Sequence, residues 1–220
     1  MQVRVSVAAA MWCVAAFVPT LKAQGDPVGA YQLRYAANLP LSGSVVNLTN
    51  SGASSTSPGL VGGLPQNGNL CANIYTYSPD EQLVSCCTCL LTPNALAVLS
   101  VREDLAGNTL TPSIPSAVVV KLLASTGLAG TCSAPTVTRT GDNRLAPGLL
   151  AWGTTIHLLP NTAATAPGTY GAAETAFSIG TLSDAELTRM TQLCAFIRAN
   201  GSGYGICKSC RFGGLGAASK

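Results

Sequence analysis

The cysteines constrain this chain more than any other feature of its sequence. Nine occur in 220 residues, and three of them fall within SCCTCLL, residues 85–91, an apolar run with no neighbouring histidine or acidic residue. Such a cluster can bind a metal, carry out redox chemistry or form structural disulfides. The choice depends first on the compartment, because disulfides persist in oxidising surroundings and are rare in the cytosol.

The N-terminus predicts export. Arg4 precedes an uncharged apolar stretch over residues 5–18, which is followed by Pro19 and a small-residue exit at Ala23. This is the layout of a secretory signal peptide over residues 1–23, and the stretch is shorter than the roughly 20 apolar residues of a membrane span. We expect a secreted or extracytoplasmic protein, in the periplasm, on the cell surface or in the medium, with no stable membrane anchor after cleavage.

Cleavage leaves an even number of cysteines, which favours disulfides. They are Cys71, Cys86, Cys87, Cys89, Cys132, Cys194, Cys207 and Cys210. Two C-x-x-C spacings, at 86–89 and 207–210, would suit zinc in a cytosolic chain, but the export signal and the extra thiols around the first pair argue against it. A redox centre needs its first thiol at a helix N-terminus, and neither spacing is expected there. We therefore expect structural disulfides, no metal and no cofactor.

Charge gives no indication of a nucleic-acid partner. The chain has 12 basic and 9 acidic residues, and two of the basic ones, Arg4 and Lys22, leave with the signal peptide. The remaining lysines and arginines are scattered singly, whereas a nucleic-acid binder clusters them for phosphate contacts.

Composition divides the mature chain into four segments. Residues 24–49 contain two strand-like runs and form an N-terminal strand-bearing arm. Residues 50–69 are rich in Gly, Ser and Pro, which predicts a loop or linker. Residues 70–210 form the cysteine-bearing body, and residues 211–220 form a glycine-rich flexible tail.

The body is predicted to be mainly β. Short β-branched and apolar runs bounded by Pro, Gly or Asn occur at 95–101, 116–125, 135–140 and 149–160. With the arm and the cysteine-rich hairpin, they indicate a disulfide-stapled antiparallel β-sandwich.

One α-helix is expected near the C-terminus, over about residues 184–199. Ser183 and Glu186 have the spacing of a capping box, and Gly201 ends the segment. Apolar residues recur at helical spacing, which indicates a face that packs on a sheet. They are Leu187, Met190, Leu193, Cys194 and Ile197.

The segment LCANIYTYSPDEQLVSCCTCLL predicts a β-hairpin that turns near Asp80. A turn centred there places Cys71 opposite Cys89, or opposite Cys87 after a shift of register, so we expect a bridge from Cys71 to one of them. In a strand Cys86 points to the other face, toward Cys132 or toward the helix and the C-terminal cysteines.

No catalytic constellation stands out. His157 lies in a strand-like run, and a hydrolase triad would need it together with Asp142 or Asp184, but no G-x-S-x-G elbow presents a serine. Neighbouring carboxylates, at 80–81 and 103–104, are expected to be solvated turn charges. We assign no catalytic residue.

Aromatic residues offer weak candidates for a ligand site. Sugar-binding modules stack ligands on exposed rings, for which Trp152, Tyr75 and Tyr77 are the candidates, although packing is the expected use of the two tyrosines. Asn47 and Asn200 match the glycosylation acceptor pattern.

Three blocks carry a family resemblance: NLCANIYTYSPDEQLVSCCTCLLTPNALAVLSV, LTPSIPSAVVVKLLA and LCAFIRANGSGYGICKSC. With its SCCTC and GICKSC motifs, the chain resembles a family of exported bacterial proteins of the kind found in acidobacterial genomes. The resemblance implies a bacterial, extracytoplasmic setting. No established activity comes with it, so it assigns no catalytic residue.

These features predict a secreted, non-enzymatic structural or cell-surface protein, a fibre-forming subunit that self-associates by strand addition through its N-terminal arm. The alternative is a secreted module that binds a glycan or small ligand. A third possibility is an extracytoplasmic hydrolase that uses His157.

Overall fold

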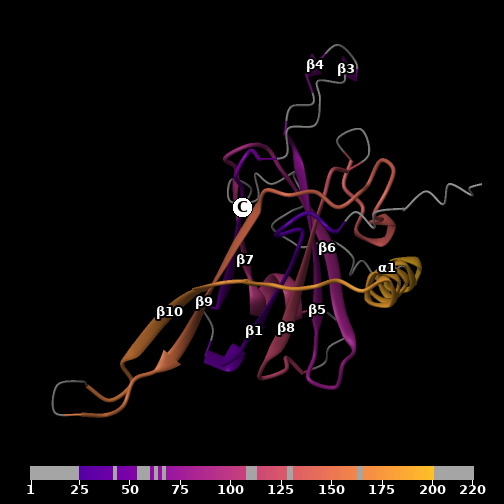
Figure 1. Cartoon of the computed structure of the whole chain (residues 1–220). Helices are drawn as coiled ribbons and strands as arrows, with labels where there is room; N and C mark the ends of the chain where they lie inside the picture. Colours follow the sequence, from indigo (N-terminus) through magenta and orange to yellow (C-terminus); the bar gives the residue numbers. More distant parts are fainter. Residues whose placement is uncertain are drawn as a thin grey trace, which may run out of the picture.

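The fold is a three-layer arrangement of two packed antiparallel sheets and one helix (Figure 1). The computed structural model describes residues 25–41, 44–53, 60–61, 64–65, 68–107, 113–127, 131–162 and 166–200. Within these ranges the protein is mainly β, a disulfide-tied sandwich with one C-terminal α-helix, so the predicted fold class is confirmed.

Sheet A has the strand order β11-β1-β8-β5-β6, and sheet B has the order β10-β9-β2-β7. The strands of sheet A are β1 (Tyr31–Ala36), β5 (Leu70–Tyr77), β6 (Leu83–Leu91), β8 (Val118–Ser125) and β11 (Ser178–Ile179). Those of sheet B are β2 (Val45–Asn50), β7 (Leu96–Ser100), β9 (Leu149–Leu158) and β10 (Tyr170–Ala176). The remaining elements are the small ribbon of β3 (Leu60–Val61) and β4 (Leu64–Pro65), the short helical turns η1 (Leu39–Leu41), η2 (Val101–Ala106) and η3 (Ala134–Thr136), and helix α1 (Asp184–Ala199).

Sheet A is covered on both faces, which explains why β5 is buried along its whole length. Leu70, Ala72 and Ile74 point toward sheet B and join the core between the sheets. Tyr75 and Tyr77 point the other way and pack in a second cluster with α1. A strand covered on both faces does not alternate between apolar and polar residues, and β5 is mostly apolar, with Asn73 and Thr76 as its buried polar residues.

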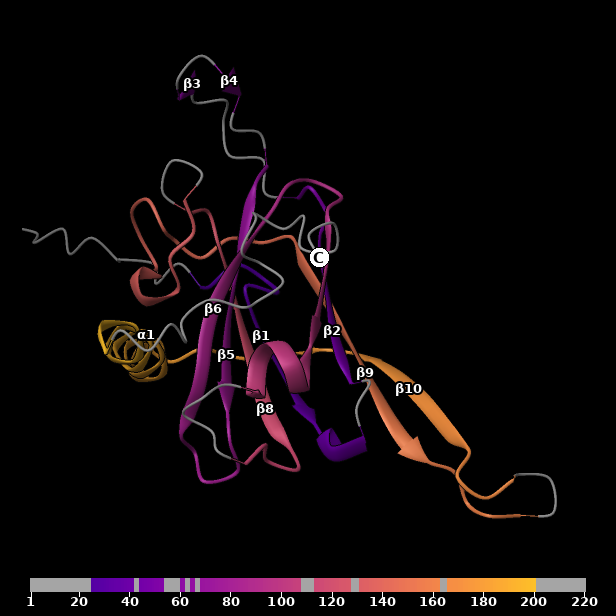
Figure 2. The same ribbon diagram turned by 180° about the vertical axis from the view of Figure 1, so that it is seen from behind.

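Helix α1 packs on the face of sheet A that is turned away from sheet B (Figure 2). The Ser183 side chain accepts a hydrogen bond from the Glu186 backbone N–H, which is one half of the predicted capping box. The Glu186 carboxylate accepts from Lys121 Nζ at 2.6 Å instead. Leu187, Met190 and Cys194 are buried against the sheet, with Ile197 also buried. The predicted helix is confirmed; Leu193 is only partly buried.

The predicted division into an N-terminal arm and a separate body is wrong. Strand β1 lies between β8 and β11, and β2 lies between β9 and β7. The core includes Val46 and Leu48, which are 1% and 0% exposed. The Gly-, Ser- and Pro-rich segment after β2 therefore connects two strands of one sandwich.

The expected bridge from Cys71 to Cys89 or Cys87 is also wrong. The hairpin of β5 and β6 forms, but its register shifts at Thr76 and Tyr77, so Cys71 lies opposite Leu90 and Ala72 lies opposite Cys89. A shift of one residue moves a side chain to the other face of the sheet. Cys71 and Cys89 thus point to opposite faces.

Residues 135–140 do not form the expected strand. Ala134–Thr136 is a short helical turn with a proline in its first positions, followed by an isolated bridge from Thr138 to Arg144. The signal peptide over 1–23, the tail over 211–220, and Cys207, Cys210 and Gly201 lie outside the described residues.

Candidate functional site: the β9–β10 hairpin and the outer face of sheet B

The hairpin of β9 and β10 projects from the sandwich. Strand β9 pairs with β2 from Leu149 to Thr154, and beyond Thr154 it pairs only with β10 among the described strands. Figure 1 shows the two strands leaving the body as an arm. We call β9 beyond Thr154, β10 and the described residues that lie between them in the sequence the hairpin arm.

A tight turn immediately precedes β10. Pro167 and Gly168 occupy its two central positions, and Gly168 has a φ of 79°. Thr169 N–H donates to Ala166 O at 3.2 Å, which closes the turn. Proline followed by a glycine with positive φ is the signature of a type II turn.

Strand β10 is an edge of sheet B, and no other described strand pairs with its outer side. Six of its seven residues are exposed and Gly171 is half-buried. Its sequence, YGAAETA, contains one charge, Glu174, and no lysine or proline. Natural edge strands usually carry such residues because they prevent pairing with other chains, so β10 lacks the usual protection.

The hydrogen bonds around β10 show which backbone groups are turned outward. Leu159 N–H donates to Thr169 O and Phe177 N–H donates to Ala151 O, both at 2.9 Å. Bonded and non-bonded residues alternate in an antiparallel pair. The residues between these two bonds therefore divide into two sets. Gly171, Ala173 and Thr175 bond to β9, and Tyr170, Ala172, Glu174 and Ala176 direct their N–H and C=O groups away from the sheet.

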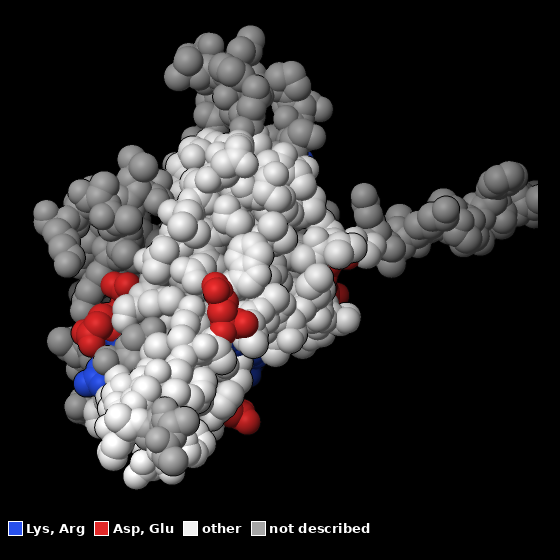
Figure 3. Space-filling model, turned by 90° about the vertical axis from the view of Figure 1, so that its left-hand side faces the viewer, with Lys and Arg blue, Asp and Glu red and all other residues white. Residues whose placement is uncertain are grey.

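The outer face of sheet B, which is turned away from sheet A, is apolar and almost uncharged. Leu96 is 58% exposed, Leu158 is 56% exposed and Tyr170 is 54% exposed. Glu174 is the one charged residue among the outward positions of the four strands as the structure describes them. Figure 3, which views the molecule from this side, contains few charged atoms. Exposed apolar patches on soluble proteins commonly mark interaction sites.

Trp152 lies within this face and is half-buried. Asn47 of β2 is its neighbour on one side and Ala176 of β10 on the other. Asn47 Nδ2 donates to Glu174 Oε1 at 3.5 Å across β9. The indole therefore lies beside an amide and a carboxylate, groups that can bond to a polar ligand.

Arg34 connects the base of the arm to sheet A. Its Nη2 donates to Thr155 Oγ1 at 2.8 Å and its Nη1 donates to Thr175 O at 3.4 Å. The guanidinium lies directly against Gly153, where an added Cβ would be 1.5 Å from Nη1. Burial lowers the pKa of Arg34, and the nearby Glu174 carboxylate opposes that shift.

His157 points to the inner side of the arm. Its Nε2 lies 2.8 Å from where a Cβ of Gly171 would be, so the imidazole ring occupies the space that a side chain at position 171 would fill. Neither proposed partner accompanies it: Asp184 accepts from Arg139 Nε at 2.7 Å, and Asp142 lies beside Thr126, which donates to its backbone carbonyl. The structure does not bring a hydrolase triad together at His157.

Within the carboxylate pairs at 80–81 and 103–104, Asp80 and Asp104 form local hydrogen bonds. Asp80 accepts from the Ser78 hydroxyl, a bond that lowers the pKa of Asp80. Asp104 accepts from Ser100 N–H at 2.7 Å, while the Ser100 hydroxyl accepts from Glu103 N–H at 3.1 Å, and these bonds cap η2.

Tyr75 and Tyr77 are core residues. Tyr75 is fully buried and its hydroxyl donates to Ala134 O at 2.6 Å, and burial raises its pKa. Burial, and to a smaller extent the Glu186 carboxylate, raises the pKa of Tyr77 to about 12. Of the three aromatic ligand candidates, only Trp152 is accessible from the surface.

The cysteines tie sheet A to the elements that cover it. Cys86 bonds to Cys194 of α1, with Cα atoms 5.6 Å apart, and Cys71 bonds to Cys132, with Cα atoms 5.5 Å apart. Cys87 is also disulfide-bonded and lies in the core between the sheets. The same is true of Cys89.

This arrangement confirms structural disulfides at the described cysteines. Cys86 and Cys89 point to opposite faces of β6, so they cannot bind one ion together while β6 remains a strand. No group of metal-binding side chains occurs in the described part of the chain.

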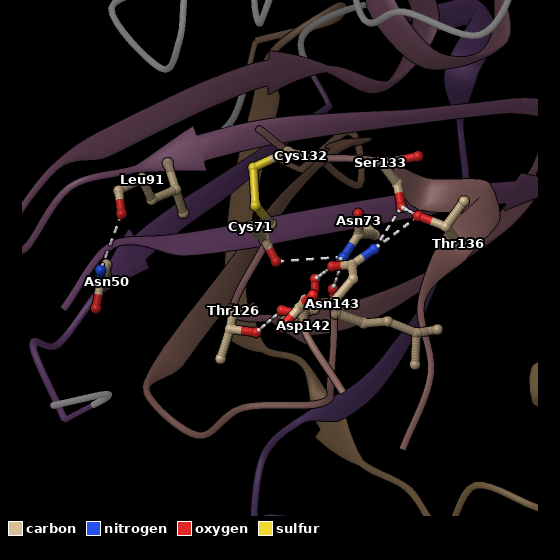
Figure 4. Close-up of a disulfide and its surroundings, with 12 residues drawn as sticks. Asn50, Cys71, Asn73, Leu91, Thr126, Cys132, Ser133, Thr136, Asp142 and Asn143 are labelled. Carbon is tan, nitrogen blue, oxygen red and sulfur yellow. Dashed lines mark hydrogen bonds between the residues drawn. A yellow bond between two sulfur atoms is a disulfide. The ribbon is translucent and has the colours of Figure 1, made fainter. Parts of the chain in front are cut away.

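A buried polar network surrounds the Cys71–Cys132 bond (Figure 4). Asn73 Nδ2 donates to Ser125 Oγ at 2.9 Å, and that hydroxyl donates to Asn143 Oδ1 at 2.7 Å. Asn143 Nδ2 in turn donates to Ser133 O at 2.9 Å. The network holds the loop that carries Cys132 against β5 and β8, which is a structural role.

No protein-family model, curated protein or solved structure matches this chain. The resemblance to exported acidobacterial-type proteins therefore stays a prediction, as do the glycosylation sites at Asn47 and Asn200. None of the helices in the described ranges has the length and apolar character that crossing a bilayer requires.

Proposed function

We propose that this protein is an extracytoplasmic, non-enzymatic structural or surface protein that self-associates by strand addition. The observation that carries the proposal is the exposed, nearly uncharged edge of β10 on the hairpin arm. A two-stranded ribbon is at best marginally stable alone in water, so an arm that extends beyond its sheet gains stability when a further strand pairs with it. The strand that adds is β10, because β1 and β2 are already paired on both sides.

The disulfides support the extracytoplasmic part of this proposal. Six of the cysteines are disulfide-bonded, and such bonds persist in oxidising compartments. The bonds tie β6 to α1 and β5 to the loop before η3, which suits a protein exposed to mechanical or proteolytic stress outside the cytoplasm.

Sedimentation velocity of the oxidised protein, from micromolar to millimolar concentration, tests self-association. We expect the sedimentation coefficient to rise with concentration, and negative-stain images to contain particles larger than one copy. A strict monomer at every concentration would overturn the proposal.

A glycan-binding module is the second candidate, because Trp152 lies beside the Asn47–Glu174 pair on the outer face of sheet B. A glycan array probed with the wild type and with Trp152→Ala tests this candidate. Tyr170→Ala, on the same face near the end of the arm, is the matched control. Signals that Trp152→Ala leaves unchanged would remove the candidate.

A further inference from the structure

The free edge of β10 presents a complete and regular set of unpaired backbone groups. Tyr170, Ala172, Glu174 and Ala176 alternate along the strand and direct their N–H and C=O groups outward. Their side chains all lie on the outer face of sheet B, and all four residues are exposed. A strand added here must be extended and must present the same alternation.

We propose that β10 pairs antiparallel with β10 of a second copy, about a two-fold axis that passes beside Ala173. This inference rests on the proposed self-association and names its partner and its register. It joins the two four-stranded sheets into one continuous sheet across the dimer. The contact is isologous, because each copy uses the same strand.

Hydrogen bonding selects this register. With the axis at Ala173, Tyr170 lies opposite Ala176 of the second copy, and Ala172 lies opposite Glu174. Every outward N–H and C=O of both strands then finds a partner, because each opposing pair consists of two outward residues. An axis at Ala172 or Glu174 leaves one outward residue of each copy unpaired.

Charge selects the same register. Glu174 is the one charged residue of β10. An axis at Glu174 would place the two carboxylates directly opposite each other, which destabilises a strand pair. With the axis at Ala173, each carboxylate faces the small Ala172 of the other copy. The strand is therefore complementary to itself in the register that also completes its hydrogen bonds.

Side-chain size permits the approach. Gly171, Ala172, Ala173 and Ala176 are small, so nothing on β10 holds a second strand away. Tyr170 of one copy lies opposite Ala176 of the other, whose β9 neighbour is Trp152. The low bulk of Ala176 leaves room for the tyrosine ring to approach the indole.

The expected affinity is moderate. A seven-residue strand is about 23 Å long at about 3.3 Å per residue, and pairing along that length buries less than the roughly 800 Å² per partner of a standard interface. We therefore expect a dissociation constant of about 10 μM or weaker, so the dimer should be abundant only at high local concentration.

Disulfide trapping tests the register. Residues 173 of the two copies form the non-hydrogen-bonded pair on the axis, with Cα atoms about 4.5 Å apart, which is within disulfide range. Ala173→Cys should give a covalent dimer under mild oxidation of the full oxidised chain. Ala172→Cys is the matched control, because its two copies lie roughly 8 Å apart in this register and should not link.

Charge substitution tests the same register without an added thiol. Ala172→Lys places an ammonium opposite Glu174 of the other copy, and the two-fold symmetry makes this contact twice in the dimer. The dissociation constant should fall by roughly two- to thirtyfold. Ala172→Glu places carboxylates opposite each other and should weaken dimerisation by a similar factor. A trapped Ala172→Cys dimer, or equal dissociation constants for the two charge variants, would overturn the register.

The outcomes separate this inference from the proposed function. If the wild type remains monomeric at all concentrations, self-association itself fails. If it self-associates but Ala173→Cys does not link and the charge variants have no effect, then self-association stands and the β10 pairing is wrong.

Discussion

The contact between Arg34 and Gly153 determines how firmly the hairpin arm is held, and a double-mutant cycle can measure it. Gly153 has no positive φ, so its backbone accepts alanine, but the added Cβ would be 1.5 Å from Arg34 Nη1 and 2.3 Å from Cζ. The guanidinium must then leave, and its bonds to Thr155 and Thr175 are lost. Hydrogen bonds to charged groups contribute about 1.5–3 kcal/mol, and the partial exposure of Arg34 places the loss at the lower end, about 1.5 kcal/mol.

Alanine in a strand is otherwise favoured over glycine by about 0.5–1 kcal/mol. Gly153→Ala should therefore destabilise the protein by about 0.5–1 kcal/mol when Arg34 is present. In an Arg34→Ala background the same change should stabilise by about 0.5–1 kcal/mol, because the space is free. The reversal of sign is the expected result, and the coupling energy should be about 1.5 kcal/mol.

Urea unfolding of the four variants, followed by fluorescence of Trp152 next to Gly153, supplies the required free energies of unfolding. Measurements should be made at low protein concentration, so that association does not contribute to stability. Additive effects of the two substitutions would refute the reasoning, because they would mean that the guanidinium does not occupy the space above Gly153.

Two further predictions concern the helix side of sheet A, and a third concerns the disulfides. Burial raises the pKa of Tyr77 to about 12, so the stability that neutral Tyr77 contributes is complete below its ordinary pKa of about 10 and is lost as the pH rises toward 12. At about pH 11 the wild type should have lost about 1.4 kcal/mol more unfolding free energy than Tyr77→Phe, as measured by rapid urea unfolding. Replacing Cys86 and Cys194 with alanine opens a link across 108 residues and should cost about 3–5 kcal/mol of unfolding free energy, with hydrogen exchange in α1 accelerated most. Peptide mapping of the oxidised protein should recover a linked Cys71–Cys132 peptide, and any other partner for Cys71 would contradict the fold.

The sequence predicted the elements whose signals are local. The cap at Ser183 and the apolar spacing of α1 determine that helix without reference to the rest of the chain. The cysteine pairing failed because it depends on an irregularity: the register shift at Thr76 and Tyr77 moves Cys71 and Cys89 to opposite faces. Turn residues and spacing do not reveal such a shift.

The candidate site was missed for a related reason. Strand β10 was not predicted, because its alanines, glycine and glutamate have low β propensity and its sequence has no apolar alternation. Pairing with β9 determines its conformation, and β9 was recognised. The turn at Pro167 and Gly168, ten residues after His157, is the signal that could have indicated a hairpin. Trp152 was a candidate, but only the sheet places Asn47 and Glu174 beside it.

The distribution of the disulfides gives the two sheets different roles. Every described cysteine belongs to sheet A, to α1 or to the loop before η3, and none belongs to sheet B. Covalent bonds thus hold the side that is already covered, where β6 bonds to α1 through Cys86 and places Cys87 and Cys89 in the core.

Sheet B keeps its place through core packing and through Arg34, and no described element covers its outer face or its β10 edge. Rigidity on one side and an open edge on the other are the properties that a self-associating subunit needs. The fixed scaffold lowers the entropy that the edge loses when it pairs. Loosening the arm at Arg34 should therefore weaken dimerisation even though Arg34 lies outside the β10 edge, whereas removing the Cys71–Cys132 bond should lower stability and leave the dimerisation constant of the folded protein unchanged.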